Sequence, residues 1–224
     1  MFLQMLNEAK LKDKPLQVKL LGDSITHGLG GTGFEQDGAH IVDNFSRNSN
    51  GYCWAKLFKE YLEENYNCIV SNNACTGTNI EFIIKNFYTL VEEKDDIIIC
   101  TIGTNNTLQV KNSIAKKSRE EWGRAFYDNI MALYKLCCQN SKSVVFIANI
   151  PMADYREVDG EDYWRILHMD DINAIYKKAQ EVAGFSLISM YDLFISYMHK
   201  HGETMQTLLV DGIHPNDKGY TIIF

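Results

Sequence analysis

Short apolar runs alternate with amphipathic stretches along most of this chain. Five runs have the length of β-strands, and the third is apolar throughout, as a strand buried on both faces of a sheet should be. These runs lie at residues 17–21, 68–71, 96–102, 144–150 and 186–190. Between them, apolar side chains recur every three or four residues, which is the period of a helix with one buried face. The alternation predicts an α/β fold, a three-layer α/β/α sandwich around a five-stranded parallel sheet.

Capping signals and apolar stripes place the helices between these strands. Two helices are expected to begin with a capping box, one formed by Thr78 and Glu81 and the other by Ser118 and Glu121. The expected stripes are Trp54, Leu57, Phe58, Tyr61 and Leu62; Ile80, Ile83, Ile84 and Phe87; Trp122, Ala125, Phe126, Ile130 and Leu133; and Ile172, Ile175, Tyr176 and Ala179. A short helix is expected over 191–198. The last expected helix, near 218–223, would have barely two turns, which would fit either a truncated chain or a compact variant. No repeat or linker interrupts the pattern, so we predict one domain over residues 1–224.

Composition narrows the class of protein further. The 224 residues carry a net charge of −7 without any basic block, which argues against nucleic acid or an anionic membrane as the partner. No apolar run reaches the roughly 18 residues of a membrane span, and the start of the chain lacks the apolar core of a signal peptide. The six cysteines form no CxxC pair and are expected to be reduced, without a zinc site. We therefore expect a cytoplasmic protein; its oligomeric state is not readable from the sequence.

The polar residues with chemical potential follow the predicted strands. Ser24 follows the first strand, Gly77 the second and Asn105 the third, while Asp211 and His214 lie in a loop after the fifth. Binding sites in parallel α/β sheets lie at the carboxyl ends of the strands. These residues are therefore expected to share one site.

Three of these residues suit nucleophilic catalysis. The Asp211-x-x-His214 spacing lets the carboxylate face Nδ1 of the imidazole, leaving Nε2 to accept the proton of a serine. Ser24, held at the end of a buried strand, supplies the hydroxyl. Each residue alone would more often be an ordinary turn or capping residue, but together they predict a Ser24–His214–Asp211 catalytic triad.

An acyl-transfer site also needs donors for the oxyanion that develops in the transition state. The expected donors are the amides of Ser24 and Gly77 and the side-chain amide of Asn105; Gly77 precedes a helix whose free amides favour negative charge. Neighbouring residues are candidates for binding the substrate, namely Asp23, Thr104, Asn106 and Ile213.

These blocks resemble those of the SGNH (GDSL) hydrolase family. Gly-Asp-Ser-Ile-Thr around Ser24, Gly77, Gly-x-Asn ending at Asn105, and Asp211-x-x-His214-Pro occur in the family's order, from about residue 17 to the end of the chain. The resemblance implies a flavodoxin-like sheet and hydrolysis of esters without a metal or other cofactor. It also implies the roles just named for the triad and oxyanion donors. One departure is Asn106, where the family often has Asp.

Other motifs are weaker. Gly28-x-Gly30-x-x-Gly33 has the spacing of a dinucleotide-binding loop, but no amphipathic helix follows it, so nicotinamide binding is disfavoured. The GxSxG elbow of α/β-hydrolases is absent, because Ile25 and Thr26 follow Ser24. Two alternatives to an ester hydrolase stay open, an O-acyltransferase that uses the same triad and a non-catalytic ligand-binding module.

Two polar and aromatic insertions, at residues 30–50 and 152–169, are expected to shape the substrate pocket. Neither has a long apolar stripe, which favours a short acyl group, such as acetyl, on a carbohydrate or other polar alcohol over a lipid. The residues considered are Phe34, Glu35, Asp37, His40, Asp43, Asn44, Arg47, Tyr155, Arg156, Tyr163, Trp164 and His168.

Overall fold

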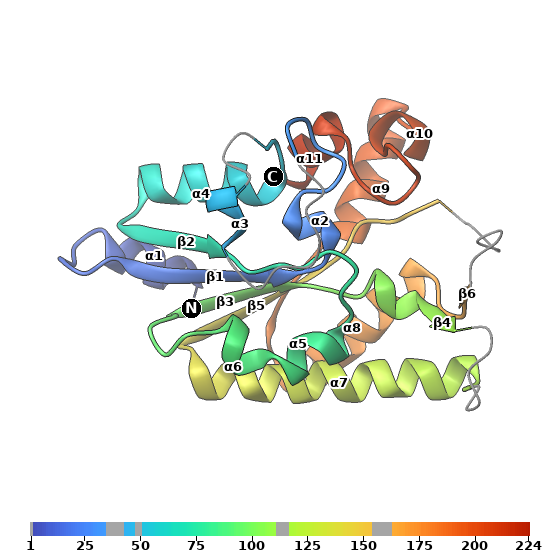
Figure 1. Ribbon diagram of the computed structural model, residues 1–224, viewed down its shortest axis with the longest axis horizontal. Coiled ribbons are helices and arrows are strands. Elements are labelled where there is room, and N and C mark those ends of the chain that lie inside the picture. The colour runs from blue at the N-terminus through green and yellow to red at the C-terminus, as the bar shows by residue number, and fades with distance from the viewer. Residues whose placement is uncertain (1, 35–42, 48–50, 111–116, 154–162) are drawn as a thin grey trace.

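A central sheet of five parallel strands organises the protein (Figure 1). The computed structural model describes residues 2–34, 43–47, 51–110, 117–153 and 163–224. The strands of the sheet are β1 (Leu16–Gly22), β2 (Cys68–Asn72), β3 (Ile97–Thr101), β5 (Ser143–Ala148) and β7 (Ser186–Ser189). Their spatial order is β2-β1-β3-β5-β7, with every neighbouring pair parallel. Counted along the sequence this is the 2-1-3-4-5 order of flavodoxin-like sheets, so the predicted fold class is confirmed.

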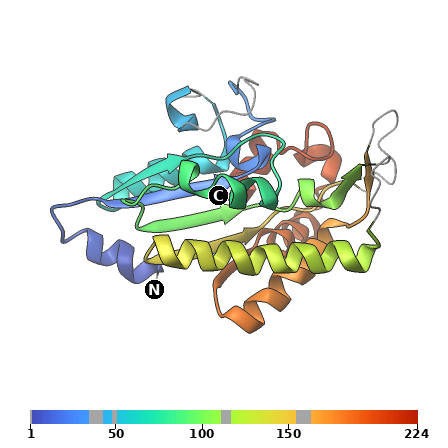
Figure 2. The ribbon, with the colours of Figure 1, turned by 60° about the horizontal axis from the view of Figure 1, so that its bottom comes forward.

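Helices cover both faces of the sheet, and the described part of the chain contains no helix long and apolar enough to cross a membrane. Figure 2 shows α7, the longest of the described helices, running along one face of the sheet. The helices are α1 (Phe2–Ala9), α2 (Ser24–His27), α3 (Asn44–Arg47), α4 (Trp54–Asn65), α5 (Ile80–Lys85), α6 (Phe87–Leu90), α7 (Arg119–Asn140), α8 (Met169–Ala183), α9 (Met190–His201), α10 (Met205–Leu208) and α11 (Asp217–Ile223), with a 3-10 turn, η1, at Asn105–Thr107.

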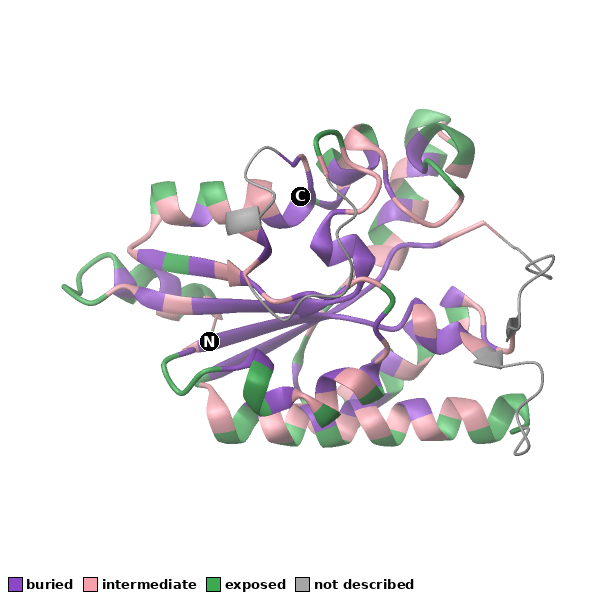
Figure 3. Ribbon diagram, viewed as in Figure 1, coloured by how far each residue is buried: buried purple, intermediate pink, exposed green. Residues whose placement is uncertain are grey.

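Two hydrophobic cores lie on opposite faces of the sheet because successive strand residues point in opposite directions. Leu20 packs into a core with residues of α1, α4, α9 and α11, whereas the adjacent Leu21 packs with residues of α5, α6, α7 and α8. Residues of β3 divide in the same way, Ile99 to the first core and Ile98 to the second. Both faces of the inner strands are thus buried, as Figure 3 shows, which explains why β3 and β5 are almost entirely apolar.

One helix start differs from the prediction. The capping box of Ser118 and Glu121 is present at the start of α7, but the helix after β2 is capped by Asn79, whose side chain accepts the Phe82 amide at 3.0 Å. The Thr78 hydroxyl instead donates to the carbonyls of Gly22 and Cys75. The spacing was misleading because a hydroxyl that binds the neighbouring loop is not available to cap a helix.

Several elements were not predicted, and two examples are helix α1 and a second sheet. Helix α1 packs Leu6 and Ala9 into the first core, and its apolar residues at 2, 5, 6 and 9 already have helical spacing. The second element is a two-stranded antiparallel sheet formed by β4 (Leu108–Val110) and β6 (Tyr163–Arg165). Strands of three residues are too short to show a period in the sequence, and their pairing links segments over 50 residues apart.

Candidate active site

The first part of the site is the turn between β1 and α2. Strand β1 ends at Gly22, and Asp23 caps α2 by accepting the Ile25 amide at 3.0 Å, which leaves Ser24 as the first helical residue. A side chain at position 22 would not fit, because a Cβ atom there would lie 2.5 Å from the Thr26 hydroxyl and 2.6 Å from the Thr101 carbonyl oxygen. Close packing of β1 against β3 therefore holds the turn that presents Ser24.

The second part is the loop before α11. Asp211 Oδ1 accepts the amides of Ile213 at 2.9 Å and His214 at 2.8 Å, and Asp211 Oδ2 lies 2.7 Å from His214 Nδ1. A bond from the Val210 amide to the His214 carbonyl, at 2.9 Å, closes the loop. One carboxylate thus fixes both the backbone and the imidazole of His214, as the local spacing predicted.

The fold brings these two parts into contact. Ser24 Oγ lies 2.8 Å from His214 Nε2, although the residues are 190 positions apart in the sequence. Ser24 is 5% exposed, and the side chains of His214 and Asp211 are 14% and 51% exposed. Hydrogen-bonding groups therefore run without a break from the buried Ser24 hydroxyl through His214 to the exposed Asp211 carboxylate. This arrangement can pass a proton from the serine to the imidazole.

The loops after β2 and β3 lie beside each other. The Asn105 side-chain amide donates to the Thr78 carbonyl at 2.7 Å, and the Cys75 amide donates to the Gly22 carbonyl at 3.0 Å. Gly77 is exposed and has φ +76°, and a Cβ atom there would meet nothing within 4 Å. Within the described chain, the amides of Ser24 and Gly77 have no hydrogen-bond acceptor. The two predicted backbone donors are therefore available to a ligand.

Three residues predicted to bind substrate lie beneath the site instead. Asp23, Thr104 and Asn106 are 0%, 6% and 2% exposed. Asn106 Oδ1 accepts the Ile80 amide at 3.0 Å, and its side-chain NH₂ donates to Glu81 at 2.9 Å, so it ties η1 to the start of α5. Position next to a functional residue does not show which way a side chain points, so substrate binding by these three buried residues stays a prediction. Ile213, by contrast, is partly exposed.

A residue missed by the sequence analysis joins the two main loops. Asn149 directly follows β5, and its side-chain NH₂ donates to Asp23 Oδ2 at 2.9 Å and to the Thr104 hydroxyl at 2.7 Å. Asn149 is 2% exposed. It could have been found by extending to the fourth strand of the sheet the rule that polar residues gather where parallel strands end.

Another missed residue is His27, at the end of α2. Its Nδ1 lies 2.7 Å from the hydroxyl of Thr76, the neighbour of Gly77, and its ring contacts Phe34 edge-on. His27 is buried at 4% exposure, so it supports the Gly77 loop from within the protein. A lone histidine directly after the Gly-Asp-Ser-Ile-Thr block gave no periodic or spacing signal.

The carboxyl groups in the site have opposite electrostatic surroundings. Burial raises the pKa of Asp23 to about 6, and hydrogen bonds from Ile25, Thr104 and Asn149 offset only part of this effect. Burial also raises the pKa of Asp211, but hydrogen bonds from His214 and Ile213 outweigh it and leave the pKa below its ordinary value. Asp211 is thus the carboxylate that stays ionised beside the imidazole.

The glycine-rich loop after α2 has a packing role. A Cβ atom on Gly30 would lie 2.5 Å from the Pro215 carbonyl oxygen and 3.0 Å from His214 Cβ, and one on Gly31 would lie 1.8 Å from the Tyr52 carbonyl oxygen. Helix α2 also ends at His27, before this loop. The glycines therefore allow the close approach of the segment that carries His214, a feature unlike a phosphate-binding loop that opens a helix.

The predicted pocket insertions are only partly described. Asp43 and Asn44 bind the end of β2 and the loop after it, accepting the Asn72 amide at 2.8 Å and donating to the Ala74 carbonyl at 2.6 Å. His168 caps α8 and borders a cavity. Outside the described residues lie Glu35, Asp37, His40, Tyr155 and Arg156, and the side chains of Arg47, Tyr163 and Trp164 are likewise not described.

The cysteines and acidic residues form no metal-binding group in the described part of the chain. All six cysteines are free, and Cys138 is the exposed one.

Comparisons with known proteins agree with this fold. No curated protein matches the chain in sequence. Among solved structures, an acetylxylan esterase from Geobacillus stearothermophilus has a TM-score of 0.67 at 15% identity, covering 94% of this chain and 91% of that one. An alpha/beta hydrolase enzyme from the metagenome of Lake Arreo, Spain, has a TM-score of 0.67 at 19% identity, covering 96% and 94%. At these identities the similarity shows the fold.

Sequence comparison supplies the family. The profile of the GDSL-like lipase/acylhydrolase family matches residues 20–222, which include every part of the site described above. The chain therefore belongs to the GDSL-like lipase/acylhydrolase family and is a carboxylic ester hydrolase.

Proposed function

We propose that this protein is a serine esterase that cleaves small acyl esters through an acyl-enzyme, with Ser24 as nucleophile, His214 as general base and Asp211 as the group that orients His214. The observation that carries the proposal is the unbroken contact from Ser24 Oγ to His214 Nε2 at 2.8 Å and from His214 Nδ1 to Asp211 at 2.7 Å. The lowered pKa of Asp211 supports it, because an ionised carboxylate keeps the Nδ1 proton in place and leaves Nε2 to act as base.

In the first half-reaction Ser24 Oγ attacks the carbonyl carbon of the ester while its proton passes to His214 Nε2. The carbonyl oxygen gains negative charge and is held by the amides of Ser24 and Gly77 and by the NH₂ of Asn105. The tetrahedral intermediate collapses by breaking the bond to the alcohol oxygen, which takes the proton from His214. An acyl group remains on Ser24.

In the second half-reaction a water molecule attacks the acyl carbon and gives its proton to His214 Nε2. Collapse of the second tetrahedral intermediate breaks the bond to Ser24 Oγ, which regains the proton, and the carboxylic acid leaves. Nucleophile, base and oxyanion donors all come from this chain, so the proposal assigns no step to a metal.

The structural neighbours support these roles. Structures titled as catalytic mutants of the Geobacillus stearothermophilus acetylxylan esterase replace a serine, an aspartate, and a histidine three positions after the aspartate. Asp211 and His214 have the same spacing here. We extend the proposal to acetyl esters of carbohydrates, in keeping with that neighbour and with the polar residues around the site.

The residues beneath the site receive supporting roles. We assign Asp23, Thr104 and Asn149 to holding the Ser24 turn against the Asn105 loop, and Asn106 to fixing that loop on α5. Ile213, partly exposed next to His214, is retained as a substrate contact.

Hydrolysis of p-nitrophenyl acetate by Ser24→Ala tests the proposal. We expect turnover to fall by about 10⁴ or more, since loss of the nucleophile removes the covalent route. A matched control is Ser186→Ala, because Ser186 is an exposed serine at the opposite end of the sheet, at the start of β7. A fluorophosphonate probe should add its mass to wild type at Ser24. Wild-type turnover by Ser24→Ala, or labelling at another residue, would refute the assignment.

A further inference from the structure

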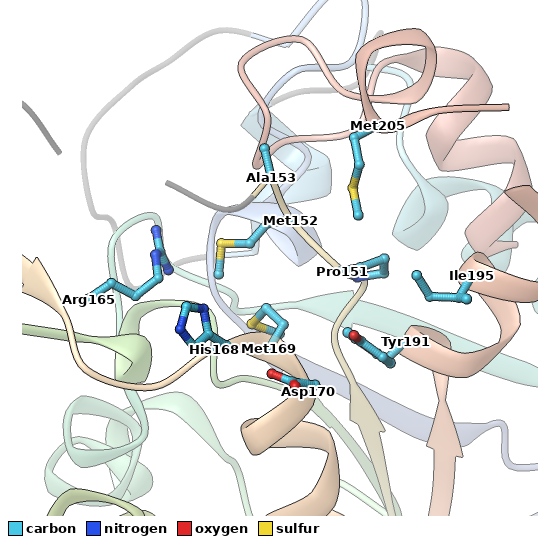
Figure 4. A pocket seen from close by; sticks show the side chains of 10 residues that line it. All are labelled: Pro151, Met152, Ala153, Arg165, His168, Met169, Asp170, Tyr191, Ile195 and Met205. Atoms are coloured by element: carbon cyan, nitrogen blue, oxygen red, sulfur yellow. The ribbon is translucent and has the colours of Figure 1, made fainter. Parts of the chain in front are cut away.

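A cavity of about 350 Å³ lies beside the site, where the segment after β5 faces the starts of α8 and α9 (Figure 4). Small-molecule pockets measure about 300–1,000 Å³, so its size suits a ligand. Its lining residues are Pro151, Met152, Ala153, Arg165, His168, Met169, Asp170, Tyr191, Ile195 and Met205. None of the triad residues or oxyanion donors is among them.

This cavity is connected to the acid–base loop. A second hollow of about 260 Å³ is lined by Asp211 and Gly212 and shares Ala153 and Met205 with the first. The Ala153 amide also donates to the Gly212 carbonyl at 2.8 Å, so the segment after β5 is fixed to the loop of His214. The two hollows thus adjoin at Ala153 and Met205, one bordered by Asp211 and the other by His168.

The position of the cavity indicates that it would bind the alcohol part of the ester. His214 returns its proton to the leaving oxygen, so the alcohol part of the substrate departs on the side of the imidazole. The proposed oxyanion donors Gly77 and Asn105 belong to other loops, those after β2 and β3. A substrate with a long alcohol part would extend past His214 and Asp211 into the cavity.

The chemistry of the lining selects the class of ligand. The Asp170 carboxylate and the Tyr191 hydroxyl border the cavity, as Figure 4 shows, together with Arg165, whose guanidinium donates to the Thr107 hydroxyl. An alkyl chain would cover the Asp170 carboxylate and the Tyr191 hydroxyl without offering either of them a hydrogen bond.

The charges that border the cavity disfavour an anionic ligand. An anionic ligand attracted by Arg165 would be repelled by Asp170, which borders the same cavity. A neutral ring that carries several hydroxyl groups satisfies donors and acceptors together and can rest its apolar face on Tyr191, Met152 and Met169.

We propose that this cavity is a subsite for a neutral sugar unit on the alcohol side of the scissile ester, so that the protein acts on acylated oligosaccharides in preference to acylated monosaccharides. The subsite rests on the serine esterase function proposed above. It adds a binding site separate from the triad, formed by the segment after β5 and the starts of α8 and α9.

The test compares two substrates in each variant. For wild type, Tyr191→Ala and Tyr191→Phe, kcat/KM is measured with monoacetylated xylotriose and with p-nitrophenyl acetate, which has no sugar. The ratio of the two values should fall about tenfold in Tyr191→Ala, the loss expected when a contact worth about 1.4 kcal/mol disappears, and less in Tyr191→Phe. Tyr197→Ala is the matched control, because Tyr197 lies on the same helix, stacks on His201 and does not line the cavity. It should keep the wild-type ratio.

Several outcomes would overturn the subsite. One is a ratio that stays the same in both Tyr191 variants. Another is a loss that appears with p-nitrophenyl octanoate instead of the saccharide ester, which would assign the cavity to the acyl chain. Calorimetric titration with unacetylated xylotriose separates this question from catalysis: binding that is lost in Tyr191→Ala supports the subsite even if Ser24→Ala keeps full esterase activity and the proposed function fails.

Discussion

Two aspartates flank the contact between Ser24 and His214, and their surroundings shift their pKa values in opposite directions. The side chain of Asp211 is 51% exposed and receives hydrogen bonds from two amides and an imidazole, and its pKa lies below the ordinary value. Asp23 is fully buried, and burial raises its pKa to about 6 despite three hydrogen-bonding partners. The balance between desolvation and donors thus differs within one site.

The difference separates the proposed catalytic carboxylate, Asp211, from Asp23, whose hydrogen bonds hold the scaffold. An exposed carboxylate with directed donors remains ionised at little cost and can stabilise a protonated His214. A buried carboxylate beside the same serine is costly to ionise, and its hydrogen bonds to Ile25 and Asn149 serve to join loops. The same contrast holds for Asn105, which is partly exposed, and its buried neighbour Asn106.

The largest expected effect comes from Asp211→Asn. We expect kcat for p-nitrophenyl acetate to fall by about 10³–10⁴, because an amide in place of the carboxylate favours the wrong tautomer of His214. The matched variant is Asp23→Asn, for which we expect a change of less than about tenfold, since Asp23 does not contact the imidazole in this way. Equal losses in the two variants would remove the distinction between the aspartates.

The next largest effect is expected at the neighbouring residues Asn105 and Asn106. Asn105→Ala should lower kcat by about 10²–10³ through loss of an oxyanion donor, with little change in the free energy of unfolding. Asn106→Ala should instead lower the free energy of unfolding by about 1–3 kcal/mol, because the Ile80 amide is left buried without its acceptor. Steady-state kinetics and urea unfolding of both variants measure the two effects; near-normal turnover by Asn105→Ala would exclude that residue from the site.

The smallest effect concerns the pH dependence of stability. Between its ordinary pKa of 3.8 and about 6, folded protein retains on Asp23 a proton that the unfolded chain releases. The contribution of Asp23 to stability therefore falls as pH rises through this range and stays low above it. The free energy of unfolding of Asp23→Asn relative to wild type should rise by about 1–3 kcal/mol from pH 4 to pH 7. Urea unfolding at several pH values measures it, and a difference independent of pH would contradict a raised pKa.

Much of the fold could be predicted from the sequence because the signals for its strands and helices are local. The apolar runs predicted all five strands of the sheet, and the signal is clearest in β3 and β5, which are buried on both faces and have few polar positions. Helix α7 was predicted with its capping box because Ser118 and Glu121 bind each other's amides without help from another element. The box at Thr78 was wrong for the opposite reason: the Thr78 hydroxyl binds Gly22, from another strand.

The sequence by itself determined the local geometry of Asp211 and His214, because the two residues are close enough along the chain for their own backbone to set it. It also determined which residues follow the strands, and so which could share a site. Only the tertiary structure decided that Ser24 Oγ meets His214 Nε2, that Asp23 and Asn106 are buried while Asp211 is exposed, and that Asn149 joins two loops. The direction of a side chain and its exposure to water depend on what other strands and helices pack against it, and no local pattern contains that information.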